Sequence, residues 1–189
     1  MDLNGSIFHA INQLAGRSSV VDDAMKFAAQ YVIFAIMAIA VLSWFLRSGN
    51  DADRRMAVYT AGAASLLALV AALAIQHFYV HQRPFVLRTD VRLLLKHSAD
   101  ASFPSEHATV GFALATGILF FRARLGLLLV ALASLTAFSR VFVGIHYPYD
   151  VLGGAAVGAI SAGLARLAYP LFTWIDQTYV VRLVPEPLR

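Results

Sequence analysis

Two long uncharged stretches constrain the fold of this chain more than any other feature of its sequence. Residues 28–46 and 57–75 each run for 19 residues without a formal charge. A helix needs roughly 20 apolar residues to cross the hydrocarbon core of a bilayer. Each stretch is therefore predicted to span a membrane as a helix, whose backbone hydrogen bonds are satisfied within the segment itself.

The composition agrees with a chain embedded in a membrane. Of the 189 residues, 59% are hydrophobic and 14% are charged, against roughly 25% charged in soluble domains. This length predicts a single domain, 1–189. Because cysteine is absent, disulfides, thiolate nucleophiles and Cys-ligated zinc are excluded. The net charge of +4 fits contact with anionic lipid headgroups or, alternatively, basic residues that set the orientation of the chain in the membrane. The basic residues are scattered among apolar runs, so no nucleic-acid partner is predicted.

Three shorter segments are predicted to complete the bundle: about 108–121, 125–145 and 151–172. The first has only 14 uncharged residues and would rise about 21 Å as a helix, so we expect a span with one end recessed in the protein. The fold class is thus an all-α polytopic membrane bundle of five spans over 24–172. Gly154 and Gly158 form a GxxxG in the last span, which predicts packing within the bundle or, alternatively, a dimerisation face.

Both ends of the chain are predicted to lie outside the spans. Residues 1–20 lack the features of a cleavable signal peptide, and an interfacial helix is expected there, with a sixth span as the alternative. Its apolar face comprises Leu3, Ile7, Ile11 and Leu14, with Phe8 beside it. Residues 173–189 are predicted to form a cytoplasmic tail, anchored at the headgroups by Trp174 and Tyr179, in which Pro185 and Pro187 disfavour a long helix.

Lysine and arginine counts predict the orientation. One side carries the larger group of basic residues and is therefore predicted to be cytoplasmic: Arg47, Arg54, Arg55, Arg122, Arg124, Arg182 and Arg189. The opposite side, formed by 81–106 and 146–150, still carries four cations: Arg83, Arg88, Arg92 and Lys96. The excess of basic residues on the cytoplasmic side is therefore modest, and these four residues need another role.

Three polar clusters are expected to converge on that opposite side, each at a helix end: Arg83-Pro84, Pro104 to His107, and Ser139-Arg140 with His146 and Asp150. Charged groups at membrane depth are costly and usually face a polar cavity or a partner. Two arginines and two histidines at converging ends predict an anion-binding site. Alternatively, the arginines anchor lipid phosphates and the histidines are structural.

The spacing of His146 and Asp150 suggests what the site does with an anion. Four residues apart at the start of a helix, they can share a face and hydrogen-bond. An aspartate that accepts Nδ1–H fixes the tautomer and leaves a lone pair on Nε2, which would make His146 a nucleophile. His107 would need the opposite protonation state, so that it could protonate a leaving oxygen. The two histidines are predicted to share the work of phosphoryl transfer.

These clusters resemble the tripartite signature of the type 2 phosphatidic acid phosphatase family, which includes the vanadium haloperoxidases. The family pattern has a lysine separated by six residues from Arg-Pro, then Pro-Ser-Gly-His, then Ser-Arg with a histidine six residues after the arginine and an aspartate four residues later. Here the last two read PSEH and SRVFVGIHYPYD. The resemblance covers roughly residues 76–154, and the hydrophobic spans favour the membrane branch.

The resemblance implies a role for each matching residue. His146 attacks phosphorus to form a phosphohistidine, Asp150 orients it, and His107 protonates the leaving group and then activates water. The phosphate oxygens are held by Arg83, Arg140 and Ser105. No metal and no other cofactor is implied, and the sequence has no carboxylate cluster of the kind that holds Mg²⁺ or Ca²⁺.

Two positions depart from the family pattern. Gln76 stands where the lysine is expected, and Glu106 replaces the glycine before His107. One hypothesis is that a nearby cation holds a second phosphate while Glu106 pairs with one of the candidates, which are Arg88, Arg92 and Lys96; surface anchoring by these three is the alternative. The other histidines lack comparable partner spacing and are not expected to be catalytic: His9, His77, His81 and His97.

Within the family, the small size, the acidic residue in PSEH, the missing lysine and the run AFSRVFVGIHYPYDVLG resemble bacterial undecaprenyl-diphosphate phosphatases of the bacitracin-resistance type. This implies hydrolysis of undecaprenyl diphosphate to undecaprenyl phosphate, in recycling of the cell-wall lipid carrier at the outer face of the inner membrane. Its partners would be the polyprenyl or phospholipid phosphate and membrane lipids. The alternatives are a phosphatidylglycerophosphate or phosphatidate phosphatase and a non-catalytic lipid-binding or transport protein.

Overall fold

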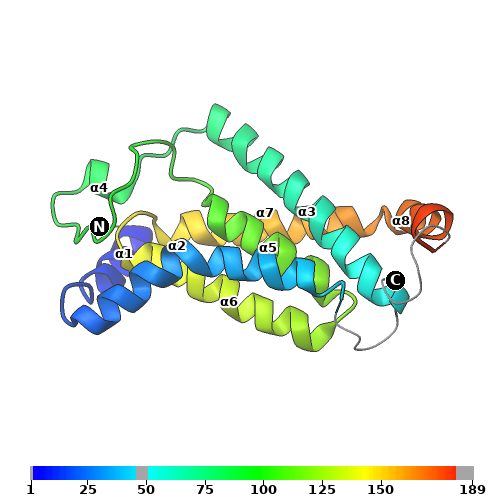
Figure 1. Cartoon of the computed structure of the whole chain (residues 1–189). Helices are drawn as coiled ribbons and strands as arrows, with labels where there is room; N and C mark the ends of the chain where they lie inside the picture. The colour runs from blue at the N-terminus through cyan, green and yellow to red at the C-terminus, as the bar shows by residue number, and fades with distance from the viewer. Residues whose placement is uncertain (1, 46–50, 182–189) are drawn as a thin grey trace.

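A computed structural model describes residues 2–45 and 51–181, which contain helices and no strands (Figure 1). The helices are α1 (Leu3–Asn12), α2 (Ser19–Leu42), α3 (Asp51–Phe78), α4 (Pro84–Leu87), α5 (Glu106–Leu119), α6 (Ala123–Phe142), α7 (Pro148–Arg166), α8 (Tyr169–Ile175) and a π-helical turn, η1 (Asp176–Val180). The predicted all-α fold is confirmed. Five basic residues or prolines named above lie outside the described residues: Arg47, Arg182, Pro185, Pro187 and Arg189.

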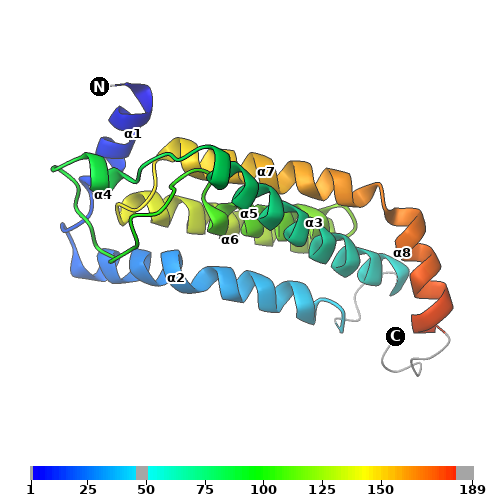
Figure 2. The ribbon, with the colours of Figure 1, turned by 90° about the horizontal axis from the view of Figure 1, so that it is seen from above.

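The five long helices form one bundle around α5 (Figure 2). α5 contacts α2, α3, α6 and α7, and its buried positions are mostly small residues such as Ala108, Ala113 and Gly117. Among the described residues, α2, α3 and α6 are each long and apolar enough to cross a membrane, and α7 is too if its bent continuation is counted. The 14-residue α5 is shorter than a span, so three or four of the five expected spans meet this test.

The helix of the last span ends before residue 172, the predicted end of this segment. α7 stops at Arg166, and α8 continues after a bend of 59°. Pro170 explains the break, because a proline within a helix lacks an N–H and clashes with the carbonyl four residues before it. The expected tail is therefore helical through Val180, and the buried Asp176 binds Arg55 through two hydrogen bonds of 2.7 and 3.0 Å.

The N-terminal helix α1 lies at the polar end of the bundle. Its ten residues rise about 15 Å, which is too short to cross a bilayer as a sixth span. Leu3 and Ile7 are exposed, whereas Phe8 and Asn12 are buried, so the helix leaves much of its apolar face available to lipid. Asn12 donates to the carbonyls of Phe142 and Arg92 and thereby fastens α1 to the end of α6.

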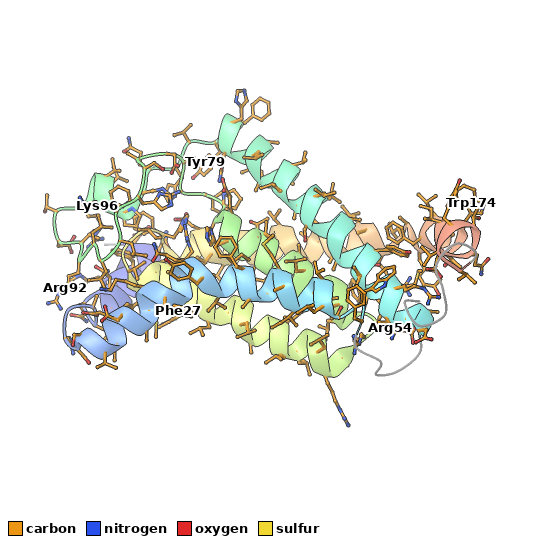
Figure 3. All side chains as sticks on the ribbon, in the orientation of Figure 1. Phe27, Arg54, Tyr79, Arg92, Lys96 and Trp174 are labelled. Atoms are coloured by element: carbon orange, nitrogen blue, oxygen red, sulfur yellow. The ribbon has the colours of Figure 1, made fainter. Side chains whose placement is uncertain are left out.

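The two ends of the bundle differ in their polar residues. Arg54 and Trp174 lie at one end, whereas Tyr79, Arg92 and Lys96 lie at the other (Figure 3). Arg54 and Arg55, which the sequence places on the basic side, lie in the first turns of α3, which begins at Asp51. The basic residues predicted for one side of the membrane and the polar clusters predicted for the other therefore lie at opposite ends of the described bundle.

Two glycines let α7 approach α5 closely. A Cβ on Gly154 would lie 2.7 Å from the Ser105 carbonyl oxygen, and one on Gly158 would lie 2.4 Å from that of Thr109. Both distances are far below van der Waals contact. The GxxxG pattern therefore packs within the bundle, as one of its two interpretations predicted.

We expect Gly158→Ala to destabilise the bundle, because the added methyl group must displace the backbone of α5. Overpacking of this kind costs about 1–3 kcal/mol. Gly163→Ala on the same helix is the matched control, since its Cβ would meet nothing within 4 Å. Thermal unfolding in detergent should show a lower midpoint for Gly158→Ala alone; equal midpoints for the two variants would contradict this packing.

Candidate active site

The site lies at one end of the bundle, where the 79–105 connection meets the starts of α5 and α7 and the end of α6. Backbone hydrogen bonds hold these segments together. The amide of Ser105 donates to the Asp150 carbonyl at 3.0 Å, and that of Leu94 in the connection donates to the carbonyl of Val143 at the end of α6 at 3.1 Å. The three predicted polar clusters are thus brought together, although they are far apart in sequence.

A tight turn between α6 and α7 presents His146. Gly144 has a φ of +90°, a conformation that glycine adopts without steric cost, and a Cβ there would lie 2.9 Å from the Arg92 carbonyl oxygen. Pro148 then begins α7, and Asp150 accepts a hydrogen bond from the Tyr147 amide at 2.7 Å. His146 is held inside this turn with 2% of its surface exposed.

Two buried arginines converge on Nε2 of His146. Arg83 Nη1 lies 3.1 Å from this nitrogen and Arg140 Nη2 lies 3.4 Å from it. A guanidinium can only donate hydrogen bonds, so Nε2 is the acceptor and carries the lone pair. The predicted tautomer of His146, with its proton on Nδ1, therefore follows from contacts on the side opposite to Asp150.

Protein acceptors hold the two guanidiniums in place. Arg83 donates to Asp100 Oδ1 at 2.7 Å and to the Ile145 carbonyl at 3.0 Å, and Arg140 donates to the Ala29 carbonyl at 3.1 Å. These contacts come from α2, the 79–105 connection and the turn before α7. Both side chains are thus held by protein acceptors from three separate segments.

Two buried polar atoms at the site have no hydrogen-bond partner among the described residues. They are the hydroxyl of Ser105, which is fully buried, and Nε of Arg140. Buried polar groups are almost always satisfied, so these two are notable. Together with the arginine donors around His146, they can receive the oxygens of a tetrahedral anion.

Asp150 is bound by several donors, but His146 is not directly among them. His146 Nδ1 lies 3.6 Å from Asp150 Oδ2, which exceeds hydrogen-bond length. Ser102 lies between them, with its hydroxyl 2.5 Å from Asp150 Oδ2 and 3.3 Å from His146 Nδ1. The direct hydrogen bond that the four-residue spacing predicted is replaced by a link through this serine.

Electrostatics keep the nucleophile candidate neutral. Burial lowers the pKa of His146, and the charges of Arg140 and Arg83 act in the same direction, against the opposing effect of Asp150. Burial and the charge of Arg83 also lower the pKa of His97, whose Nε2 lies 3.4 Å from Arg140 Nη2. Both imidazoles are therefore unprotonated near pH 7, as a nitrogen nucleophile must be.

His107 lies in the first turn of α5 and is partly buried. Its electrostatic neighbours are Arg140, His97 and Arg83, two of which also contact His146. The charges of the same two arginines therefore act on His107, at the start of α5, and on His146, in the turn before α7. That the two histidines share one anion stays a prediction.

The two positions that depart from the family pattern and the three loop cations have different surroundings. Gln76 donates from Nε2 to the Pro104 carbonyl at 3.1 Å, which ties the end of α3 to the turn before α5. Arg88 pairs with Asp90, and Arg92 binds the carbonyls of Gln13 and Ala15. Lys96 and Glu106 are exposed, and Lys96 directly precedes His97.

Sequence reasoning missed four residues at the site: His81, His97, Asp100 and Ser102. Their spacing carries no helical signal, because they lie in the irregular 79–105 connection. Ser102 and His81 are each two residues from a matching motif residue, Pro104 and Arg83, and this proximity was the one available indication. Among the described residues, no group of three or more His, Cys, Asp or Glu side chains is placed to hold a metal ion.

Comparison with known proteins places this geometry in context. The profile of the PAP2 superfamily matches residues 55–174. Undecaprenyl-diphosphatase BcrC of Bacillus subtilis (strain 168) is 41% identical over 158 residues, which cover 84% of this chain and 80% of that protein. The bacitracin transport permease protein BcrC of Bacillus licheniformis is 30% identical over 176 residues, covering 93% and 85%. The crystal structure of Aquifex aeolicus LpxE has a TM-score of 0.75 at 25% identity, covering 88% and 96%.

We expect Arg140→Gln to weaken the binding of orthovanadate, a tetrahedral anion, by about tenfold or more, because a charge-assisted hydrogen bond contributes roughly 1.5–3 kcal/mol. Arg124→Gln makes the same change of charge at an exposed position in the first turn of α6, at the opposite end of the bundle. Calorimetric titration of both detergent-solubilised variants measures the Kd. Equal affinities would show that the arginines at His146 do not form an anion site.

Proposed function

Because the chain belongs to the PAP2 superfamily, we propose that it is a membrane phosphatase that hydrolyses undecaprenyl diphosphate to undecaprenyl phosphate. The observation that carries this proposal is the pair of buried guanidiniums at the lone pair of His146 Nε2. A neutral nitrogen nucleophile surrounded by fixed cationic donors is suited to attack on phosphorus. The similarity to Bacillus subtilis undecaprenyl-diphosphatase supports the choice of lipid diphosphate.

In the first step, Nε2 of His146 attacks the terminal phosphorus of the diphosphate. A nitrogen–phosphorus bond forms, the bond to the bridging oxygen breaks, and His107 gives that oxygen a proton. In the second step, His107 takes a proton from water, whose oxygen attacks the phosphohistidine and releases inorganic phosphate. His107 thereby ends the cycle in its starting protonation state.

The donors around His146 stabilise the transition states of both steps. Negative charge builds up on the equatorial oxygens as phosphorus becomes five-coordinate, and preorganised donors in a buried site are most effective against such charge. We assign the oxygens to Arg83, Arg140 and the hydroxyl of Ser105. Of the three loop cations, we assign Lys96 to the second phosphate, since Arg88 and Arg92 are engaged elsewhere.

An apolar groove below the site suits the lipid tail. A cavity of about 140 Å³ is bordered by α2, α3 and α5, with Met37, Val58, Gly62, Val110 and Leu114 among its lining residues. Val110 and Leu114 lie three and seven residues beyond His107, so they continue its face of α5. We assign this groove to the isoprenoid tail, which then stays within the bilayer while its diphosphate enters the site.

The chain is a multi-pass membrane protein, and we propose that it lies in the bacterial inner membrane with His146 facing the extracytoplasmic side. The support is the position of Arg54, Arg55, Arg122 and Arg124 at or next to the starts of α3 and α6, the opposite end of the bundle from the site. Basic residues favour the cytoplasmic side. This orientation presents the site to lipid diphosphate in the outer leaflet.

A transport function is the second candidate, because one relative is named a transport permease. The free lone pair of His146 Nε2 among these donors favours catalysis over transport, since a carrier needs no nucleophile. Phosphatidylglycerophosphate or phosphatidate is the alternative substrate class for a phosphatase.

The substrate assignment is tested by phosphate release from detergent-solubilised lipids. We expect kcat/KM to be highest for undecaprenyl diphosphate, compared with phosphatidylglycerophosphate and phosphatidate, and His146→Ala to release no phosphate because the nucleophile is gone. General acid–base catalysis is worth about 10²–10⁴-fold, so His107→Ala should retain only a small fraction of the activity. A higher kcat/KM for a phospholipid would contradict the assignment of undecaprenyl diphosphate as the substrate. Full activity of His146→Ala would contradict the assignment of His146 as the nucleophile.

The groove assignment predicts that Gly62→Phe raises KM for undecaprenyl diphosphate but not for a water-soluble short-chain prenyl diphosphate. A Cβ at Gly62 meets nothing within 4 Å, so the phenyl ring can enter the groove without displacing the backbone. Gly163→Phe on α7 is the matched control, because its Cβ is equally unobstructed. A similar rise of KM for both substrates, or for both variants, would contradict the assignment.

A further inference from the structure

The link between His146 and Asp150 runs through the hydroxyl of Ser102. This serine is fully buried, and its oxygen lies 2.5 Å from Asp150 Oδ2 and 3.3 Å from His146 Nδ1. A carboxylate only accepts hydrogen bonds, so the serine proton points to Asp150. The serine oxygen is then left to accept the Nδ1–H of His146, which is the tautomer that the two arginines require on the other side of the ring.

The second oxygen of Asp150 is bound by His81. Nδ1 of His81 lies 3.1 Å from Oδ1 and must donate, because that oxygen cannot. The imidazole of His81 stacks against Tyr79 with an interplanar angle of 13° and also contacts the ring of Tyr147 at 5.4 Å between centroids. These contacts fix the orientation of the ring and hence the direction of its N–H.

We propose that Ser102 and His81 are positioning residues for the phosphatase reaction: Ser102 transmits the charge of Asp150 to the nucleophile, and His81 fixes the plane of the Asp150 carboxylate. The proposal rests on the proposed function. Its basis is the hydrogen bonding of three side chains, because Ser102 and His81 each donate a hydrogen bond to the carboxylate of Asp150.

The chain of donors explains how Asp150 acts without touching His146. As Nε2 bonds to phosphorus, positive charge develops on the imidazole and Nδ1–H becomes a stronger donor. The Ser102 hydroxyl is polarised in turn and donates more strongly to Asp150, so each bond strengthens the next. No proton is transferred in this step. Without the hydroxyl, the 3.6 Å gap leaves Nδ1–H without a close acceptor as charge develops.

His81 has a separate contribution, because a carboxylate with one free oxygen can rotate. The Tyr147 amide and Ser102 both donate to Oδ2, and His81 alone among these three donors binds Oδ1. Loss of its N–H would let Asp150 turn away from the optimum for Ser102. We therefore expect a smaller effect at His81 than at Ser102.

Four variants separate these roles from mere packing. Ser102→Ala removes the hydroxyl but keeps the amide that donates to the His81 carbonyl. His81→Phe keeps a ring between the two tyrosines and loses the donor, whereas His81→Asn loses the ring and keeps an N–H near the position of Nδ1. Ser161→Ala is the matched control for a buried serine, since Ser161 is 3% exposed on α7.

With undecaprenyl diphosphate as substrate, we expect Ser102→Ala to lower kcat by roughly 10–100-fold and His81→Phe by about threefold to tenfold, with KM changed little in either, since a hydrogen bond that strengthens only in the transition state acts on kcat. His81→Asn should recover most of the loss seen in His81→Phe. Ser161→Ala should match the wild-type chain. Thermal midpoints should agree across the four variants.

A readout that needs no substrate accompanies the kinetics. Orthovanadate accepts a fifth ligand and so reports on the nucleophile, whereas inorganic phosphate reports on the anion donors alone. Ser102→Ala should weaken vanadate binding by tenfold or more, by the same hydrogen-bond arithmetic, and leave the Kd of phosphate unchanged. Unchanged vanadate affinity together with wild-type kcat would overturn the proposal, and so would His81→Asn behaving like His81→Phe.

Failure of the proposed function gives a different pattern. If the wild-type chain binds vanadate but releases no phosphate from undecaprenyl diphosphate, the substrate assignment falls, while the ratio of vanadate to phosphate affinity still decides the role of Ser102. If the wild-type chain turns over and Ser102→Ala does so equally well, the positioning proposal alone falls. Equal loss of vanadate and phosphate affinity in Ser102→Ala would indicate a disordered site and would also overturn it.

Discussion

The burial of two guanidinium groups against one imidazole nitrogen is the constraint that organises this structure. Two like charges with little exposure repel each other and lose hydration, so protein acceptors must replace the water. The acceptors come from segments far apart in the chain: Ala29, Ala101, Ile145 and Asp100. Helix ends and the 79–105 connection are held where those acceptors are needed, and the remaining donors are left for an anion.

The bundle provides a rigid frame for this cluster. Gly154 and Gly158 bring α7 into contact with the backbone of α5, which sets the distance between the helices that carry Asp150 and His107. The hydrogen bond from the Ser105 amide to the Asp150 carbonyl joins the same two helix starts. Because the frame is made of helices packed through small residues, it fixes the positions of these two helix starts relative to each other.

Much of the fold could be predicted from local patterns. Uncharged stretches predicted where the helices lie. Because consecutive connections between spans alternate between the two sides of the membrane, the same stretches also predicted that the polar clusters share one end. Both predictions rest on the cost of placing charge in a bilayer. The helix ends were predicted less well. α7 stops at Arg166, and the expected tail forms α8 and η1; the break follows from Pro170, but the docking of the tail depends on the Arg55–Asp176 pair, which joins residues 121 positions apart.

By itself, the sequence determined that the chain is a helical membrane bundle and that polar motifs of a phosphatase signature share one end. It also predicted which side chains serve as nucleophile, acid and phosphate ligands in the proposed reaction. Tertiary structure alone decided how Asp150 reaches His146, through Ser102, and what Gln76 binds. The physical reason is that helical periodicity fixes which side chains share a face, whereas residues in an irregular connection are placed by hydrogen bonds to distant segments. Such bonds leave no spacing in the sequence from which they can be read.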